Sequence, residues 1–249
     1  MLRSALSFLG MLALVFSLRF FVAEPFAIPS PSMYPTLIEG DYLYVSKFNY
    51  GYSRYNLHLF GLIREIFPNA PKLFEGRIFA KEPKRGDVAV FLGEHDLVRY
   101  VKRVIGLPGE KIEFKKGVIY INDKPLPLER IEDYRGRTVL STSKTPQYIE
   151  TLPNGYKHKI LRDDPNGNLP SDNMGPYYVP EGRYFMVGDN RNHSGDSRYD
   201  SPVGYVPFEN FLGPAQFIFF SIDSSFWDIW RIWEWPEIIR LKRFFTLIV

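Results

Sequence analysis

The pattern of apolar and polar positions along this 249-residue chain opens with an almost wholly apolar stretch. Residues 4–18 hold no charged side chain, and Phe20, Phe21, Val22 and Ala23 extend the run past Arg19. The whole stretch covers roughly twenty residues, which is enough to cross a bilayer if the Arg19 side chain reaches the interface. The pattern therefore predicts a membrane-spanning helix at the start of the chain.

A cleaved leader is the alternative interpretation of this apolar stretch. Cleavage of a leader requires small residues one and three positions before the cut. A cut after Ala23 would place Phe21 at the third position, and a cut after Ala27 would place Pro25 there. Because neither site fits, we expect an uncleaved membrane anchor over residues 1–23.

The charges around the anchor bear on its orientation. Arg3 and the free N-terminus favour a cytoplasmic start, whereas Arg19 weakens the contrast between the two ends. Long domains cross the membrane largely regardless of charge. We therefore expect the rest of the chain to lie outside the cytoplasm.

Beyond the anchor, the apolar positions form short runs that are typical of β-strands. These runs are Asp41–Val45, Asp87–Leu92, Leu97–Ile105, Lys111–Phe114, Val118–Ile121, Tyr184–Val187 and Gln216–Phe220. In Leu107–Glu110, Pro and Gly occupy the two central positions of a type II turn, and Lys115–Gly117 indicates a hairpin. Residues 57–67 fit one short helix. The sequence predicts a mainly β catalytic domain over residues 24–121 and 181–222.

Two further segments differ from this domain in composition. Residues 122–180 are rich in Pro, Asn, Asp, Gly and Thr, which indicates an inserted, loop-rich β subdomain away from the chemistry. Residues 223–249 form a tail with all four tryptophans, followed by Arg240, Lys242 and Arg243. Trp and basic residues together suit a membrane interface, and a tail packed on the core is an equal alternative.

Charge and cysteine content narrow the chemistry. The net charge is +3, from 31 basic and 28 acidic side chains that are spread along the sequence. We do not expect nucleic acid as a partner, because nucleic-acid binding calls for a dense basic face. The lack of cysteine excludes disulfides, thiolate catalysis and Cys-ligated zinc, and the four histidines are too dispersed for a metal motif. We expect neither a cofactor nor a metal.

Ser32 lies in the proline-bracketed run Ile28–Leu37, a few residues after the anchor. A serine in a loop is inert unless a base activates it. Lys102 is one candidate base, because strand alternation places Tyr100 and Val104 on its own face. Burial between such neighbours would lower the pKa of the amine and leave a neutral base near neutral pH. A solvated strand lysine is the alternative.

His193 is the other candidate base, because a Ser-His-Asp arrangement can be drawn with Asp189 or Asp196. The stretch Gly188–Asp200 is so rich in Asp, Asn, Ser and Arg that a turn held by side-chain hydrogen bonds is the alternative. The residues alone leave a membrane-tethered β domain with a candidate serine nucleophile and two candidate bases.

Four blocks of sequence, in this order, resemble the bacterial type I signal peptidases, also called leader peptidases. The blocks are Ile28–Leu37 with Gly40 and Asp41, Lys84–Val88, Tyr100–Glu110, and Gly188–Arg191 with Ser194–Arg198. With the anchor they frame nearly all of the chain, and they leave residues 122–180 and the Trp-rich tail without a distinctive motif.

The resemblance implies a fold, a place and an activity. The fold is a mainly β signal-peptidase-like arrangement of coiled antiparallel sheets behind an N-terminal transmembrane helix. The place is the bacterial inner membrane, crossed once, with the catalytic domain on the periplasmic, extracytoplasmic side. The activity is removal of signal peptides from exported preproteins after Ala-x-Ala-like sites, so that signal peptides and the lipid bilayer are the implied partners.

The resemblance also implies a Ser/Lys dyad without a role for histidine. Ser32 would attack the scissile carbonyl and Lys102 would act as general base. The Ser32 backbone N–H and the Ser30 hydroxyl would form the oxyanion hole, where each preorganised donor stabilises the tetrahedral intermediate by a few kcal/mol.

Further residues take supporting roles in the same resemblance. Ser194 matches a serine that orients the lysine amine, and Asp196 and Arg198 match an ion pair that shapes the site. An extended substrate would be recognised by shallow pockets for small side chains. The matching lining residues are Phe26, Ile28, Pro29, Met33, Leu37, Val90, Tyr100 and Val101.

Three positions depart from the family pattern. Pro31 replaces the usual glycine before the nucleophile, which fixes φ and removes an N–H that the oxyanion hole does not use. His193 stands where an Asn or another polar residue is common, and Arg99 precedes the Tyr-x-Lys block. Substrate preference near the rim of the pocket is therefore left open.

Other functions fit parts of the sequence. A self-cleaving repressor-type or conjugation-type Ser/Lys protease would share the chemistry, but the anchor and the lack of a DNA-binding region disfavour a repressor. A silent membrane-tethered scaffold has no physical need for Ser30, Ser32, Lys102 and Ser194. An interfacial protein that acts through its Trp-rich tail alone leaves the four blocks unexplained.

Overall fold

The computed structural model describes residues 7–11, 17, 22–55, 76–94, 96, 98–136, 144–223 and 230–248. Most of the predicted anchor over residues 1–23 and the helix expected at residues 57–67 lie outside the described residues. Residues 7–11 are helical and exposed. Within the ranges described, no helix combines the length and the apolar character needed to span a bilayer.

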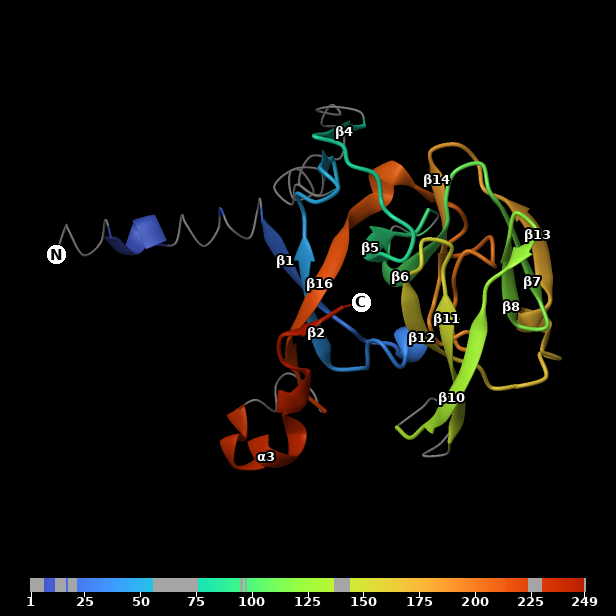
Figure 1. The fold of residues 1–249 in the computed structure, drawn as a ribbon. Helices are drawn as coiled ribbons and strands as arrows, with labels where there is room; N and C mark the ends of the chain where they lie inside the picture. Colours follow the sequence, from blue (N-terminus) through green and yellow to red (C-terminus); the bar gives the residue numbers. More distant parts are fainter. Residues whose placement is uncertain are drawn as a thin grey trace.

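The described chain is mainly β, as the sequence predicted, and its largest sheet is antiparallel throughout (Figure 1). Its strands, in spatial order, are β1 (Ala23–Ala27), β2 (Asp41–Ser46), β16 (Phe211–Ser221), β5 (Val88–Leu92), β6 (Arg99–Gly106), β14 (Arg183–Val187) and β15 (Val206–Pro207), with β17 (Thr246–Leu247) beside β16. The first residues of β16 pair with β5 and its later residues pair with β2. One long strand thus joins the two halves of the sheet.

Three smaller sheets complete the β structure. One sheet has the order β13 (Met174–Tyr178), β7 (Lys111–Lys115), β8 (Val118–Ile121) and β9 (Lys124–Pro125). A second contains β10 (Leu128–Tyr134), β11 (Thr145–Thr151) and β12 (Lys157–Leu161), and a third contains β3 (Tyr52–Ser53) and β4 (Arg77–Ile78). In Figure 1 the hairpin of β10 and β11 extends away from the main body.

The helices of the described chain are short. After residue 22 they are the 3₁₀ helices η1 (Pro31–Met33), η2 (Pro170–Asp172), η3 (Phe208–Asn210), η5 (Ile232–Glu234) and η6 (Leu241–Arg243), and the α-helix α3 (Trp235–Ile238). The predicted turn is present at Leu107–Glu110, where the Glu110 N–H donates to the Leu107 carbonyl at 3.2 Å and Gly109 has φ +79°. A side chain at Gly109 would be strained at that φ.

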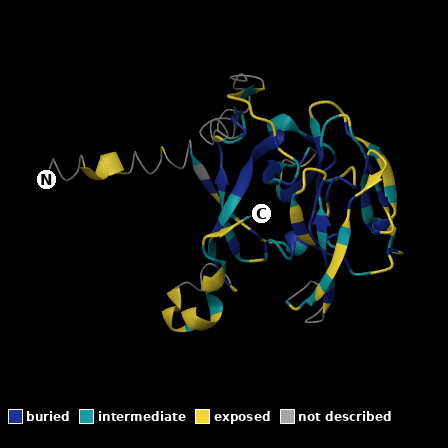
Figure 2. Ribbon diagram, in the orientation of Figure 1, coloured by how far each residue is buried: buried dark blue, intermediate teal, exposed yellow. Residues whose placement is uncertain are grey.

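The run Ile28–Leu37, which carries the candidate nucleophile Ser32, is called the nucleophile loop below. The core near this loop is one cluster of buried side chains between β1, β2, β5, β6 and β16 (Figure 2). Leu37, Leu43, Val90 and Ile218 are among its most buried members. Burying one such side chain contributes about 1.5–3 kcal/mol relative to leaving it in water. This cluster fixes the strands on which the candidate site residues lie.

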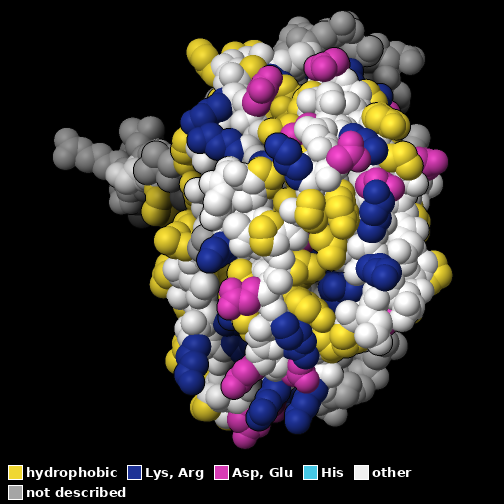
Figure 3. All heavy atoms as spheres, turned by 45° about the vertical axis from the view of Figure 1, so that its right-hand side comes forward, with side chains coloured by type: hydrophobic (Ala, Val, Ile, Leu, Met, Phe, Trp, Pro, Cys, Tyr) yellow, Lys and Arg dark blue, Asp and Glu magenta, His cyan; other side chains and the backbone are white. Residues whose placement is uncertain are grey.

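Charged and aromatic side chains are distributed differently on the domain surface and in the C-terminal tail. Figure 3 shows acidic and basic side chains interspersed on one face, with hydrophobic side chains gathered near its middle. In the tail, Trp230 and Trp233 are largely exposed. Arg240 and Arg243 instead reach back and donate to the carbonyls of Glu39 and Thr36. The tail therefore combines an exposed aromatic part with arginines that contact the core.

Candidate active site

Ser32 lies in the short helix η1, which begins directly after the extended residue Ser30. Pro31 occupies the first helical position, where the missing N–H costs nothing and the fixed φ is already helical. Asn190 binds this turn twice, because its side-chain amide donates to the Pro31 carbonyl and its backbone N–H donates to the Ser32 carbonyl, each at 3.1 Å. The nucleophile loop and the stretch after β14 are therefore fixed to one another.

The structure brings the Ser32 hydroxyl and the Lys102 amine together. The distance from Lys102 Nζ to Ser32 Oγ is 2.7 Å, and Lys102 Nζ also donates to the Val101 carbonyl at 3.0 Å. Both side chains are buried, at 7% and 4% exposure. This is hydrogen-bond distance between a nucleophile and a base.

Burial lowers the pKa of Lys102 from 10.5 to about 8, because the ammonium form loses its hydration. The carboxylates of Asp196 and Asp189 oppose this shift, and the Arg198 guanidinium adds to it. At pH 7 about one tenth of the amine would be neutral, against far less than a hundredth for an ordinary lysine. Lys102 can therefore accept a proton near neutral pH.

A second hydroxyl adjoins the nucleophile. The Ser30 and Ser32 hydroxyl oxygens lie 3.2 Å apart, so either group can donate to the other. The Ser30 hydroxyl is thus close enough to serve an oxyanion that forms beside Ser32.

Ser194 lies next to the nucleophile loop across Gly188. A Cβ atom at Gly188 would stand 2.2 Å from Ser194 Oγ and 2.5 Å from the Ser32 carbonyl oxygen, so only glycine fits there. The Ser194 hydroxyl is buried and makes no hydrogen bond of ordinary geometry among the described residues. It does not contact Lys102 through a hydrogen bond in this structure, and its lysine-orienting role stays a prediction.

Asp196 and Arg198 form a buried, two-pronged ion pair. Arg198 Nε and Nη2 each donate to a different Asp196 oxygen at 2.8 Å, and the Gly188 N–H donates to the same carboxylate at 3.0 Å. Burial alone would raise the pKa of Asp196, but Arg198 and the Gly188 N–H hold it below its ordinary value. The pair fixes the turn that carries Ser194.

The residues predicted to line the substrate pockets fall into two groups. Six of the eight belong to or pack against the cluster beneath the nucleophile loop: Phe26, Ile28, Met33, Leu37, Val90 and Val101. Leu37 is wholly buried, whereas Phe26 keeps part of its surface exposed. Pro29 is exposed, and Tyr100 packs against the neighbouring cluster around Phe91.

His193, the alternative base, has a different partner. Its Nε2 atom lies 2.7 Å from the carboxylate of Asp163, near the surface. Asp189 and Asp196, the two carboxylates considered for a triad, bind Arg103 and Arg198 instead. The described residues therefore do not assemble a Ser-His-Asp triad around Ser32.

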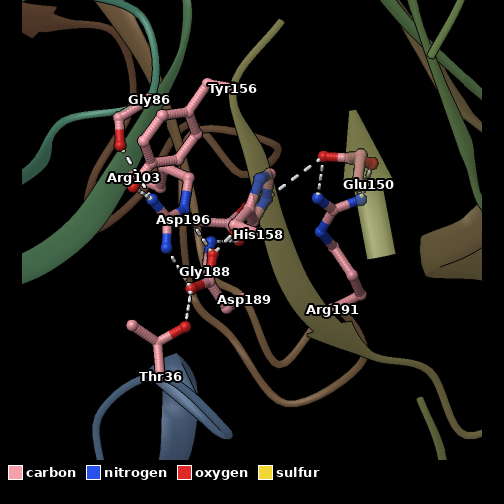
Figure 4. Close-up of polar contacts among 10 residues, drawn as sticks. All are labelled: Thr36, Gly86, Arg103, Glu150, Tyr156, His158, Gly188, Asp189, Arg191 and Asp196. Atoms are coloured by element: carbon pink, nitrogen blue, oxygen red, sulfur yellow. Dashed lines mark hydrogen bonds and ion pairs between the residues drawn. The ribbon is translucent and has the colours of Figure 1, made fainter. Parts of the chain in front are cut away.

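Sequence reasoning missed a buried ion pair between Arg103 and Asp189 (Figure 4). Arg103 donates to both oxygens of Asp189, at 2.9 and 2.7 Å, and also to the Gly86 carbonyl at 2.8 Å. The Thr36 hydroxyl donates to the same carboxylate at 2.6 Å. Burial by itself would raise the pKa of Asp189, but Arg103 holds it below its ordinary value. The pair joins β6 to the segment after β14, and Thr36 binds the loop after η1 to the same carboxylate.

A second missed pair lies beside the first and involves β11 (Figure 4). Arg191 donates to both oxygens of Glu150 on β11. His158 on β12 stands between the two pairs, with Nε2 at 3.4 Å from Glu150 and 3.8 Å from Asp189. Desolvation lowers the pKa of His158, with the Arg103 charge adding to the effect. The network thus connects β11 and β12 to Asp189 and Arg191, which flank Asn190 in sequence.

The acidic and histidine side chains of the described residues form no group of three or more that could hold a metal ion. The buried carboxylates of Asp189, Glu150 and Asp196 are instead each paired with an arginine.

Comparison with known proteins gives the chain its relatives. The family model described as signal peptidase, peptidase S26, matches residues 1–220. Signal peptidase I of Rickettsia typhi and that of Rickettsia prowazekii are each 42% identical over 252 residues, or 96% of this chain and 90% of the relative. A solved signal peptidase I from Enterococcus faecalis V583 is 31% identical and covers 54% of this chain and 97% of its own, with a TM-score of 0.32. At that TM-score the structural match adds no argument to the family model and the two Rickettsia relatives.

Proposed function

This chain belongs to the signal peptidase family, peptidase S26, and is an enzyme of the signal peptidase I type; we propose that it cleaves by a dyad of Ser32 and Lys102. The single observation that carries the dyad is the 2.7 Å distance between the Ser32 hydroxyl and the buried Lys102 amine. A buried serine and lysine in contact have no structural advantage over two apolar residues, because burying the amine costs hydration.

The chemistry follows from this contact. Neutral Lys102 takes the hydroxyl proton as Ser32 Oγ attacks the scissile carbonyl carbon. The carbonyl oxygen becomes an oxyanion, which the Ser30 hydroxyl and the Ser32 N–H stabilise. Protonated Lys102 then gives its proton to the leaving amine, and an ester to Ser32 remains. Water, deprotonated by Lys102, attacks that ester. As the second tetrahedral intermediate collapses, Lys102 returns the proton to Ser32 Oγ, and the released acid loses its own proton to solvent.

The substrate we propose is an extended signal peptide with small side chains one and three positions before the cut. Support comes from the lining, because Ile28, Val90 and Val101 are tightly packed and leave little room for a large side chain. Ala-x-Ala sequences meet that requirement. We also assign Ser194, Asp196 and Arg198 the role of positioning Lys102; the buried Asp196–Arg198 pair, which fixes the turn that carries Ser194, supports this role.

We further propose that residues 1–23 anchor the enzyme in the bacterial inner membrane as a single span, with the catalytic domain on the extracytoplasmic side. The uncharged run at residues 4–18 supports this. The domain division proposed from the sequence is kept, with residues 122–180 as an insert and residues 223–249 as a tail. Exposed Trp230 and Trp233 favour contact of that tail with the lipid interface.

Cleavage of a purified preprotein tests the proposal. The full-length enzyme in detergent is mixed with a preprotein that carries an Ala-x-Ala site, and mass spectrometry locates the new N-terminus. We expect one cut directly after the second alanine, which Ser32→Ala abolishes and the exposed-serine control Ser201→Ala preserves. Cleavage that survives Ser32→Ala would overturn the dyad, and no cleavage of several such preproteins by the wild type would overturn the activity.

A further inference from the structure

An ion pair links two strands that both have an unpaired edge near the nucleophile. Arg99 Nη1 on β6 donates to Glu24 Oε1 on β1 at 2.7 Å. Among the described residues β1 pairs only with β2, and β6 pairs with β14 only from Arg103 onward. The edges of β1 and of the first half of β6 are therefore open to an added strand, as in recognition by β-augmentation.

Strand alternation places this ion pair in line with the predicted substrate pockets. Glu24, Phe26 and Ile28 share one face of β1 and its continuation, and Arg99 and Val101 share one face of β6. Ile28, Val101 and Phe26 all meet in the cluster beneath the nucleophile loop. On β1, the residue two positions farther from Ser32 than apolar Phe26 is the charged Glu24. On β6, the residue two positions farther from Ser32 than apolar Val101 is the charged Arg99.

The two partners are not equally accessible. The Arg99 side chain is 42% exposed, while the Glu24 side chain is 11% exposed and its other oxygen lies 3.3 Å from buried Lys47 Nζ. Within the described residues Glu24 is the one hydrogen-bond partner of Arg99, through a single N–H. The other guanidinium N–H groups can meet a bound molecule. Glu24, engaged by two cations, is less available to one.

We propose that Arg99 determines specificity at the fifth residue before the cleaved bond, where it favours an acidic or amide side chain over a basic one. This inference rests on the proposed function, in which the first and third side chains before the bond enter the apolar pockets. Side chains of an extended strand return to the same face every two residues, or about 6.6 Å. The fifth side chain is therefore the next to reach the side of Phe26 and Val101, where Glu24 and Arg99 lie.

Charge complementarity sets the direction of the preference. A carboxylate or amide oxygen can accept a hydrogen bond from the exposed guanidinium, whereas an ammonium would meet a like charge. Tyr100 lies on the other face of β6, and its hydroxyl donates to Asp96 at 2.6 Å. The Asp96 carboxylate is therefore on the opposite side of the strand from Arg99. The basic start of a signal peptide would thereby be kept out of this part of the site.

A substrate series tests the inference on the full-length enzyme in detergent. Three preproteins differ only in Glu, Gln or Lys at the fifth position before the Ala-x-Ala cut. We expect kcat/KM to fall in the order Glu, Gln, Lys, with about a threefold to fivefold span, as for a partly exposed charge pair. The span should shrink at high salt, because ions screen exposed charges.

Variants separate Arg99 from a general effect of folding. Arg99→Gln should bring the three rates together and Arg99→Lys should keep their order. Arg183→Gln, which removes another partly exposed arginine of an ion pair, should leave the wild-type order unchanged. Equal rates for all three substrates with the wild type, or an unchanged order in Arg99→Gln, would overturn the inference. Those results leave Ala-x-Ala cleavage and its loss in Ser32→Ala intact, so that they are distinct from failure of the proposed function.

Discussion

Arg243 in the C-terminal tail holds the buried carboxylate of Asp41 with two hydrogen bonds, of 2.9 Å from Nε and 2.6 Å from Nη2. The same guanidinium donates to the Thr36 carbonyl at 3.0 Å. Asp41 also accepts from the Ser221 hydroxyl and from the Ile38 N–H. The tail thus contacts the segment between η1 and β2 at two points, the Thr36 carbonyl and the Asp41 carboxylate.

Loss of Arg243 should therefore weaken both the fold and the activity. In Arg243→Gln the Asp41 carboxylate stays buried without its cation, a change that typically costs about 3–5 kcal/mol. We expect a lower unfolding midpoint and a lower kcat/KM than in the wild type, while Lys242→Gln, an exposed neighbour, changes neither. Equal unfolding midpoints for the two variants would contradict this role.

The Asp41→Asn and Arg243→Gln double variant sharpens this prediction. Both substitutions remove the same ion pair. The double variant should therefore lose less unfolding free energy than the sum of the losses in the two single variants. Full additivity would mean that the two residues act independently.

Ser194→Ala should separate stability from activity. Among the described residues the Ser194 hydroxyl is buried and makes no hydrogen bond of ordinary geometry, although it helps to hold the pKa of Asp196 low, so that its removal should change the unfolding midpoint only slightly. If the hydroxyl orients the Lys102 amine during catalysis, kcat should fall about tenfold or more, as for other lost acid–base support. Ser197, whose hydroxyl binds the Met186 N–H and the Gly204 carbonyl, gives the contrast, because Ser197→Ala should lower the midpoint.

Lys102 should destabilise the fold in a pH-dependent way. Its pKa is about 8 in the folded chain and 10.5 in the reference state, so the unfolded chain binds more protons between these values and stability rises with pH. The cost of burying the ammonium is about 3 kcal/mol at pH 7 and about 1 kcal/mol at pH 10. Lys102→Met should therefore unfold at a higher temperature than the wild type at pH 7, with a smaller difference at pH 10. A variant that is less stable at pH 7 would contradict the burial cost.

Local pattern was enough to predict much of this molecule. The strands around Val90, Lys102 and Phe185 were predicted because each has apolar alternation or a short apolar run, and the Leu107–Glu110 turn because Pro and Gly fix its geometry. The whole of β1 was missed, since Ala23 was assigned to the anchor and no strand was predicted over the residues that follow it. The sequence also supplied Ser32 and Lys102 as a pair to test.

Contacts between distant segments could not be predicted in the same way. Arg103 to Asp189 and Asp41 to Arg243 join residues whose neighbours in sequence carry no sign of the partner. Only the pairing of β6 with β14, and of β2 with β16, brings these groups together. The separation of Ser194 from a hydrogen bond to Lys102 likewise depends on rotamers that no motif encodes.

The pH dependence of kcat/KM for an Ala-x-Ala preprotein tests whether Lys102 is the base that activates Ser32. We expect an activity that rises with pH through a midpoint near the Lys102 pKa of about 8, because only the neutral amine can accept the Ser32 proton. We also expect no measurable cleavage by Lys102→Met at any pH. A midpoint above pH 10, or cleavage that survives in Lys102→Met, would contradict the assignment of Lys102 as the base.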